Sequence, residues 1–150
     1  MKRKIHLFAA IVSTLCIATF FISTIIVELF GSKEAISLVK TWIVAPGLYV
    51  LVLAMILVGS TGFSASKNRQ GQLITNKKKR MPFIAINGLF ILIPCAITLN
   101  HWAAAGMFDM KFYIVQGVEL IAGATNLTLM GLNIRDGFQM TGKIQRHSSS

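Results

Sequence analysis

Four long apolar segments divide this chain, near residues 5–29, 42–63, 83–102 and 112–134. Each can cross the ~30 Å hydrocarbon core of a bilayer as a helix, which needs about 20 apolar residues. Inside a bilayer the backbone must satisfy its own hydrogen bonds, so segments of this kind form helices. With 54% hydrophobic and 13% charged residues, the chain does not resemble a water-soluble domain. The sequence therefore predicts one all-α domain over residues 1–150, an integral membrane antiparallel four-helix bundle.

The distribution of Lys and Arg predicts the topology of this bundle. Of the 15 such residues, all but Lys33, Lys40 and Lys111 lie at the N-terminus, in the connection 64–81 or in the tail 135–150. By the positive-inside rule, both termini and this basic loop are cytoplasmic, and the two short connections face outward. The N-terminal apolar run is too long for the core of a signal peptide, so we expect it to be retained. Short loops and the lack of targeting features favour a bacterial inner membrane.

Glycine, serine and proline predict where the helices begin, end and bend. Gly31 can end the first helix and Ser32 can cap the second. Pro82 suits the first turn of the third helix, where its missing N–H costs nothing. Pro46 and Pro94 fall within apolar runs, so we expect kinks or local unwinding there.

A stripe of polar and small residues follows one face of the fourth segment. Its members are Gln116, Glu119, Gly123, Asn126, Met130, Asn133 and Gly137, spaced alternately three and four residues apart. This spacing predicts a face packed against protein, either the other helices of the chain or a second copy. Glu119 is the one acidic residue inside an apolar segment, and ionisable groups within a membrane are functional candidates. The stripe thus contains a candidate ion path or, alternatively, a structural seam, formed by Gln116, Glu119, Asn126 and Asn133.

Acidic and imidazole groups also gather toward the outer side. Glu28 ends the first apolar segment, His101 ends the third and Asp109 precedes the fourth. Glu119 lies roughly 10 Å below the outer end of its helix at 1.5 Å per residue, so these groups could converge and bind a divalent cation or relay protons. No HxxxH, ExxH or CxxC spacing fixes two ligands on one face, so no metal site is predicted. We expect Glu119 to be protonated or paired with His101 or Gln116.

The basic run Lys77, Lys78, Lys79 and Arg80 is the main feature of the cytoplasmic loop. Its expected roles are to set the topology and to contact anionic lipid headgroups or a cytoplasmic partner. Nucleic-acid binding is not expected, because the loop has no aromatic residues on which bases would stack.

The chain lacks the residues that several classes of reaction require. Cys16 and Cys95 form no CxxC pair, and no GxSxG motif is present. The three histidines lie at helix ends and in the tail, so no two are placed to ligate one haem. We therefore assign no family, predict no cofactor and expect no enzyme.

Three hypotheses of function remain. The first is a non-enzymatic accessory or partner-binding membrane subunit, as a hetero-complex or homo-oligomer. The second is a small proton- or cation-coupled transporter that uses Glu119. The third is a haem- or metal-binding redox module that uses a single histidine or one from a partner.

Overall fold

The computed structural model describes residues 2–66 and 71–139, of which 94% are helical. They form four helical rods, and the all-α prediction is confirmed for this part of the chain. The first rod is α1 (Lys2–Phe30) and the last is α6 (Met110–Gln139). The second rod joins α2 (Lys33–Trp42), the π-helical turn η1 (Ile43–Gly47) and α3 (Leu48–Ser66). The third joins α4 (Gln72–Asn87), the π-helical turn η2 (Gly88–Leu92) and α5 (Ile93–Ala104).

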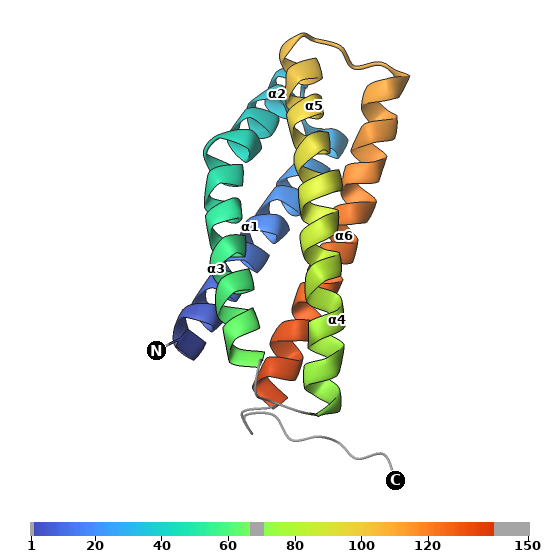
Figure 1. The fold of residues 1–150 in the computed structure, drawn as a ribbon. Coiled ribbons are helices and arrows are strands. Elements are labelled where there is room, and N and C mark those ends of the chain that lie inside the picture. The colour runs from blue at the N-terminus through green and yellow to red at the C-terminus, as the bar shows by residue number, and fades with distance from the viewer. Residues whose placement is uncertain (1, 67–70, 140–150) are drawn as a thin grey trace.

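The rods lie side by side, and successive rods run in opposite directions (Figure 1). We call the end with the α1–α2 and α5–α6 connections the upper end, and the end where α1 begins and α6 stops the lower end. Helix α1 packs most closely against α3 and also contacts α6. Helices α4 and α5 pack against α6, and α2 packs against α5. Helix α6 therefore contacts both the first and the third rods.

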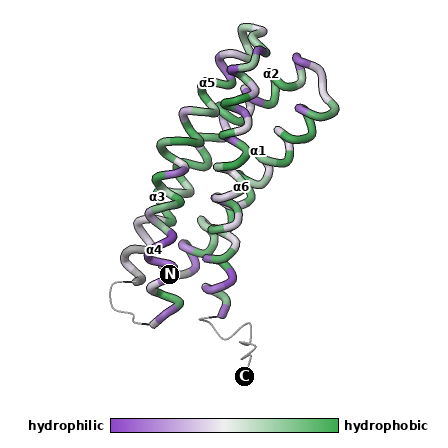
Figure 2. Tube along the Cα trace, turned by 90° about the vertical axis from the view of Figure 1, so that its right-hand side faces the viewer, coloured by the Kyte–Doolittle hydropathy of each residue, from purple (hydrophilic) through white to green (hydrophobic). Residues whose placement is uncertain are grey.

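The outer surface of the rods is strongly apolar. Phe8, Tyr49, Phe90 and Ile121 are each between 69% and 72% exposed. Hydrophobic residues cover the middle of the rods, and hydrophilic ones gather toward the ends (Figure 2). Within the described residues, three helices are long and apolar enough to cross a membrane: Lys4–Phe30, Lys33–Gly62 and Gln72–Ala104. These features indicate a membrane protein.

Helix α6 is as long as these three but more polar. Its 30 residues include the seam of amides and the carboxylate of Glu119, which lower its hydropathy. The fourth predicted span, residues 112–134, therefore stays a prediction, although the helix itself is present.

The first connection forms as the local sequence predicts. Helix α1 ends at Phe30, and the Gly31 amide still donates to the Val27 carbonyl at 2.9 Å. The Ser32 side chain accepts from the Ala35 amide at 3.3 Å and caps α2. Because an N-cap satisfies a donor that the first helical turn leaves free, α2 can start directly after α1 stops.

Both expected irregularities occur next to prolines. Ala45, just before Pro46, has φ −140° and ψ 115°, which is outside the helical region. The residue before a proline avoids the helical conformation for steric reasons. Pro94 follows the π-helical turn η2, and it has no N–H to donate to the carbonyl of Phe90 within that turn.

The predicted start of the third helix is wrong. Helix α4 begins at Gln72, so Pro82 lies inside the helix and not in its first turn. The predicted basic loop 64–81 is likewise helical over residues 64–66 and 72–81, while residues 67–70 lie outside the described part. Residues 72–81 are rich in good helix formers. Pro82 has no N–H to donate to the carbonyl of Lys78, four residues earlier, but Lys78 is exposed. The tail is helical to Gln139, and residues 140–150 also lie outside the described part.

Two small apolar clusters fill the interior between the rods. The upper one contains Ile36, Leu99, Ala103 and Phe112. The lower one contains Ile17, Leu51, Ile84 and Met130. Buried polar side chains lie between and below these clusters, and they form the candidate site.

Candidate functional site

A buried ion pair joins the second rod to the fourth. The Lys40 ammonium lies 2.6 Å from Glu119 Oε2. The Lys40 side chain is fully buried, and that of Glu119 is 13% exposed. Lys40 is buried because it shares one face of its rod with Ile36 and Ile43, which are four residues before it and three after it. That face packs toward α5 and α6 instead of toward solvent.

Two further polar side chains adjoin this pair. Gln116, one turn before Glu119, donates from Nε2 to Glu119 Oε2 at 2.9 Å. Its own Oε1 is buried, and no donor among the described residues bonds it. Glu28 lies close enough for the charges of Lys40 and Glu119 to act on its carboxyl group, and its Oε1 is also buried without a donor. We call Lys40, Glu119, Gln116 and Glu28 the upper site; it has more acceptor oxygens than donor nitrogens.

A small cavity opens beside Glu119. Its volume is about 40 Å³, and its lining includes Thr24 of α1, Ile43 of η1, Leu92 of η2 and Gly123 of α6. A water molecule needs a cavity of about 10–15 Å³ on this measure. The cavity therefore has the volume for a water molecule between the two irregular turns, although Thr24 and Glu119 are the only polar side chains among the described residues that line it.

Below the upper site, polar side chains continue along the interior face of α6. Asn87 of α4 donates from Nδ2 to Asn126 Oδ1 at 2.8 Å and to the Ala122 carbonyl at 3.0 Å. Asn126 is fully buried, and its own amide nitrogen lies 3.4 Å from the Ile84 carbonyl. Asn133 is buried too, and its Oδ1 has no donor. The structure thus places Gln116, Glu119, Asn126 and Asn133 on the inner face of α6, against the chain's own helices.

The other residues expected near the outer side are placed differently. His101 is exposed near the end of α5. Asp109 is exposed as well, and its Oδ1 accepts from the Phe112 amide at 3.1 Å, which caps α6. Within residues 2–66 and 71–139, no hydrogen bond or ion pair joins Glu28, His101 and Asp109. Glu119 does pair with Gln116, as one expectation had it, but its charged partner is Lys40 and not His101.

Sequence reasoning missed Lys40 as the partner of Glu119. Lys40 counted only as an outward-facing positive charge, although its spacing from Ile36 and Ile43 places it on a buried face. Asn87 is an amide inside an apolar run, as Asn126 is, and the two side chains bond each other between α4 and α6.

A second polar cluster lies at the lower end. Asp136 is almost fully buried and accepts from Arg80 at 2.8 Å and from the Arg135 guanidinium at 3.2 Å. Lys77 Nζ lies 3.3 Å from His6 Nε2, and His6 Nδ1 lies 3.1 Å from Thr61 Oγ1. We call His6, Lys77, Arg80, Arg135 and Asp136 the lower cluster.

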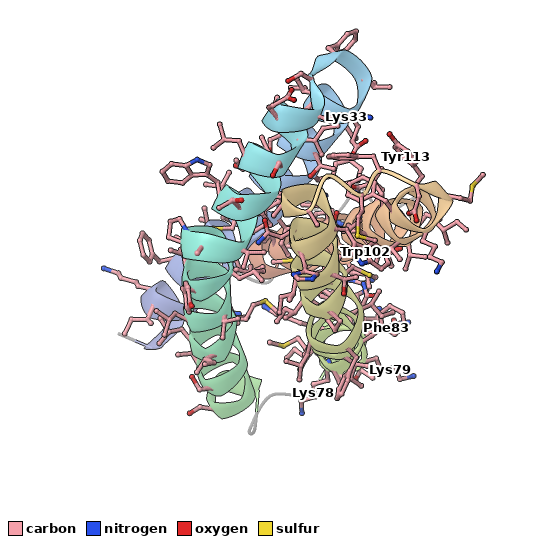
Figure 3. All side chains as sticks on the ribbon, turned by 90° about the horizontal axis from the view of Figure 1, so that it is seen from above. Lys33, Lys78, Lys79, Phe83, Trp102 and Tyr113 are labelled. Carbon is pink, nitrogen blue, oxygen red and sulfur yellow. The ribbon has the colours of Figure 1, made fainter. Side chains whose placement is uncertain are left out.

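The basic run of α4 is thereby divided between two faces. Lys77 and Arg80 are three residues apart, so they share the face that meets α1 and α6. Lys78 and Lys79 are exposed and point away from the other helices (Figure 3).

The described part of the chain brings no three His, Cys, Asp or Glu side chains together in a way that could hold a metal ion. Comparisons of the chain with protein-family models, with curated proteins and with solved structures found no significant match. Function must therefore be argued from the geometry of the upper site and the lower cluster.

Proposed function

We propose that this protein is a small proton- or cation-coupled transporter of the bacterial inner membrane. In this proposal Glu119 binds the coupling ion and Lys40 is the counter-ion that occupies its carboxylate when the ion is absent. The chain would be a four-helix antiparallel transmembrane bundle with both termini on the cytoplasmic side, so the lower end would face the cytoplasm.

The observation that carries the proposal is the ion pair between the fully buried Lys40 ammonium and the Glu119 carboxylate, 2.6 Å apart. Removing two charges from water costs about as much as their attraction returns, so an apolar pair of similar volume would stabilise the helices equally well. A charge pair buried inside a membrane helix bundle is therefore better explained by ion binding than by stability.

The neighbours of the pair support the same role. An arriving proton or cation needs acceptor oxygens, and the upper site has unpaired ones on Glu28 and Gln116. The cavity beside Glu119 is large enough for one water molecule, which Glu119 and Thr24 could bond. Once the ion is bound to Glu119, the Lys40 ammonium can turn to Glu28, whose carboxyl group already lies within range of its charge.

The irregular helix next to Lys40 supplies a place for movement. The turn η1 begins three residues after Lys40, and Ala45 within it leaves the helical conformation. Transporters commonly bind their ions where membrane helices are interrupted. A change in the Lys40 contact could therefore alter the bend between α2 and α3.

The burial of the α6 seam weakens the alternative that the seam is a docking face. Helices of the same chain already bury four residues of the seam, namely Gln116, Gly123, Asn126 and Met130. A second copy or a partner is therefore not needed to cover them.

The test is ion flux into proteoliposomes that contain the full chain, with a pH-sensitive dye inside and an imposed membrane potential. We expect wild-type protein to accelerate proton entry and Glu119→Gln to abolish that flux. The matched control is Glu34→Gln, which removes an exposed carboxylate from α2 and should leave the flux unchanged.

A folding defect must be separated from a transport defect. The single variant leaves Lys40 buried without its partner, so Lys40→Gln combined with Glu119→Gln provides a neutral pair of similar size. Unaltered flux through this double variant would contradict the proposal, and so would a wild-type protein that moves neither protons nor Na⁺ or K⁺.

A partner-binding subunit remains the second candidate, supported by the outward face of α6. Gly117, Ala124, Thr128 and Gly131 lie along that face, and a Cβ added at Gly117 or Gly131 would meet nothing within 4 Å. Small residues let helices approach closely in a membrane. Native mass spectrometry of gently extracted protein would favour this candidate if it shows a defined complex that Gly131→Leu disrupts.

An absorption spectrum and a metal analysis of the same sample test the redox-module hypothesis. A Soret band or a stoichiometric metal would favour it over both other candidates.

A further inference from the structure

The lower end of the molecule carries far more cations than carboxylates. The chain contains five Asp and Glu residues in all. Four of them, Glu28, Glu34, Asp109 and Glu119, lie in the upper half, so Asp136 is the one side-chain carboxylate of the lower half. Residues 1, 67–70 and 140–150, outside the described part, contain no Asp or Glu. Asp136 is therefore the one Asp or Glu side chain of the given sequence that the lower cluster can use, and an anion from another molecule could supply a further partner.

Both oxygens of Asp136 are already bonded to arginines. Arg80 donates to Oδ2 at 2.8 Å, and Arg135 donates to Oδ1 at 3.2 Å. The side chain of Asp136 is only 2% exposed, so there is little room for another cation around it. Within the described residues, Lys77 has no carboxylate at ion-pair distance, although Asp136 is near enough for its charge to act on the ammonium.

The partner that Lys77 does have is a neutral one. An ammonium has only donors, so the His6 Nε2 atom 3.3 Å away must be the acceptor, and the imidazole is neutral. His6 Nδ1–H then donates to Thr61 Oγ1, and the Thr61 hydroxyl donates to the Leu57 carbonyl. This chain of bonds orients the ring but supplies no negative charge. Lys77 is thus a half-buried cation with free donor capacity, and no carboxylate of residues 2–66 and 71–139 lies at ion-pair distance from it.

We propose that Lys77 and Arg80 form a phosphate-binding site at the lower end, and that the headgroup of an anionic phospholipid occupies it. Three residues apart on α4, the two side chains present an ammonium and a guanidinium on one face. Ammonium and guanidinium groups are the common partners of phosphate oxygens. Arg80 has one nitrogen on Asp136, and its side chain is 22% exposed, so its remaining N–H groups can be reached from outside.

The position of the site favours a lipid as the source of the phosphate. It lies at the ends of helices that are long and apolar enough to cross a membrane, the level at which headgroups sit. Basic pockets between membrane helices on the cytoplasmic side are known to hold such headgroups. The site does not depend on the transport of an ion through Glu119.

The test is native mass spectrometry of the delipidated full chain in detergent, titrated with phosphatidylglycerol and, separately, with phosphatidylcholine. We expect tighter binding of the anionic lipid. Lys77→Gln should weaken that binding roughly tenfold, the value of one hydrogen bond between charged groups. The neighbouring Lys78→Gln and Lys79→Gln remove the same charge from the exposed face and should stay within roughly twofold of wild type, because exposed charges interact weakly.

Inorganic phosphate, added at millimolar concentration, distinguishes a lipid headgroup from free phosphate as the occupant of the site. A lipid that stays bound supports a headgroup site, whereas phosphate that binds alone and displaces the lipid would overturn the lipid as the occupant. Equal losses in all three lysine variants would overturn the site itself, because they would show only general attraction to a basic surface. Lys77→Arg keeps the cation and should keep the binding, so its failure in a folded protein would also contradict the proposal.

Discussion

The upper site and the lower cluster both centre on one carboxylate, but their imbalances have opposite sign. At the upper site one buried ammonium faces Glu119, while acceptor oxygens of Glu28 and Gln116 have no donor. In the lower cluster two arginines share Asp136, while Lys77 has no carboxylate at ion-pair distance in the part of the chain that the structure describes. The first region lacks donors and the second lacks acceptors.

This difference indicates what each region can bind. Buried polar groups cost free energy unless they are paired, so each region is stabilised by a ligand that supplies the missing partner. In the two proposals made above, that ligand is a proton or a cation at the upper site and an oxyanion at the lower cluster. Burial adds a second difference, because Lys40 is fully buried whereas Arg135 is more than half exposed.

The largest expected effect follows from Lys40→Met. This variant leaves the Glu119 carboxylate buried without a counter-ion, which should lower the free energy of unfolding by about 3–5 kcal/mol. The combined variant Lys40→Met with Glu119→Met should recover most of that loss, because an apolar pair replaces the ionic one. Equilibrium unfolding in detergent measures both. A single variant as stable as wild type would show that the Glu119 carboxylate does not need Lys40.

A smaller effect is expected from Arg80→Gln in the lower cluster. Asp136 is buried and loses one of two guanidinium partners, so the free energy of unfolding should fall by about 1–3 kcal/mol. Lys79→Gln, on the exposed face of the same helix, is the matched control and should stay within about 0.5 kcal/mol. If both variants lose the same amount, the Arg80–Asp136 contact does not contribute to stability.

The smallest effect is expected from Arg135→Gln. Its side chain is 55% exposed, and exposed ion pairs are worth about 0.2–1 kcal/mol. This contribution should vanish in 1 M salt, where the screening length is about 3 Å, while the loss in Lys40→Met should persist because the upper pair is shielded from solvent. Unfolding of both variants at about 0.1 M and 1 M salt tests this contrast, and equal salt dependence would contradict it.

The parts of the fold that were predictable depend on neighbours in the sequence. The cap at Ser32, the end of α1 and the irregular turn at Pro46 each follow from the chemistry of a few adjacent residues. The inward face of α6 was predictable because its spacing repeats along one helix. The start of α4 was not, since the helix-forming residues 72–81 outweighed the usual boundary at Pro82.

The partners within the sites were predictable only in part. Gln116 and Glu119 are three residues apart, so helical spacing alone brings them together. Lys40 and Glu119 are 79 residues apart, and Arg80 and Asp136 are 56 residues apart. No local pattern selects one of several cations for a distant carboxylate, so these pairs follow from how the rods pack.

The sequence by itself determined that this chain is helical and built for a membrane, because hydropathy and helical spacing are properties of single segments. It also determined that carboxylates gather toward one end and cations toward the other. Four of the five acidic residues lie toward the upper end, and all but three of the 15 Lys and Arg residues lie toward the lower end. Only the tertiary structure decided that Lys40 is buried against Glu119, and that Lys77 lies on neutral His6 instead of on a carboxylate. The physical reason is that charge pairing acts through space: the packing of α2, α4 and α6 sets which ionised groups meet and which are left without a partner.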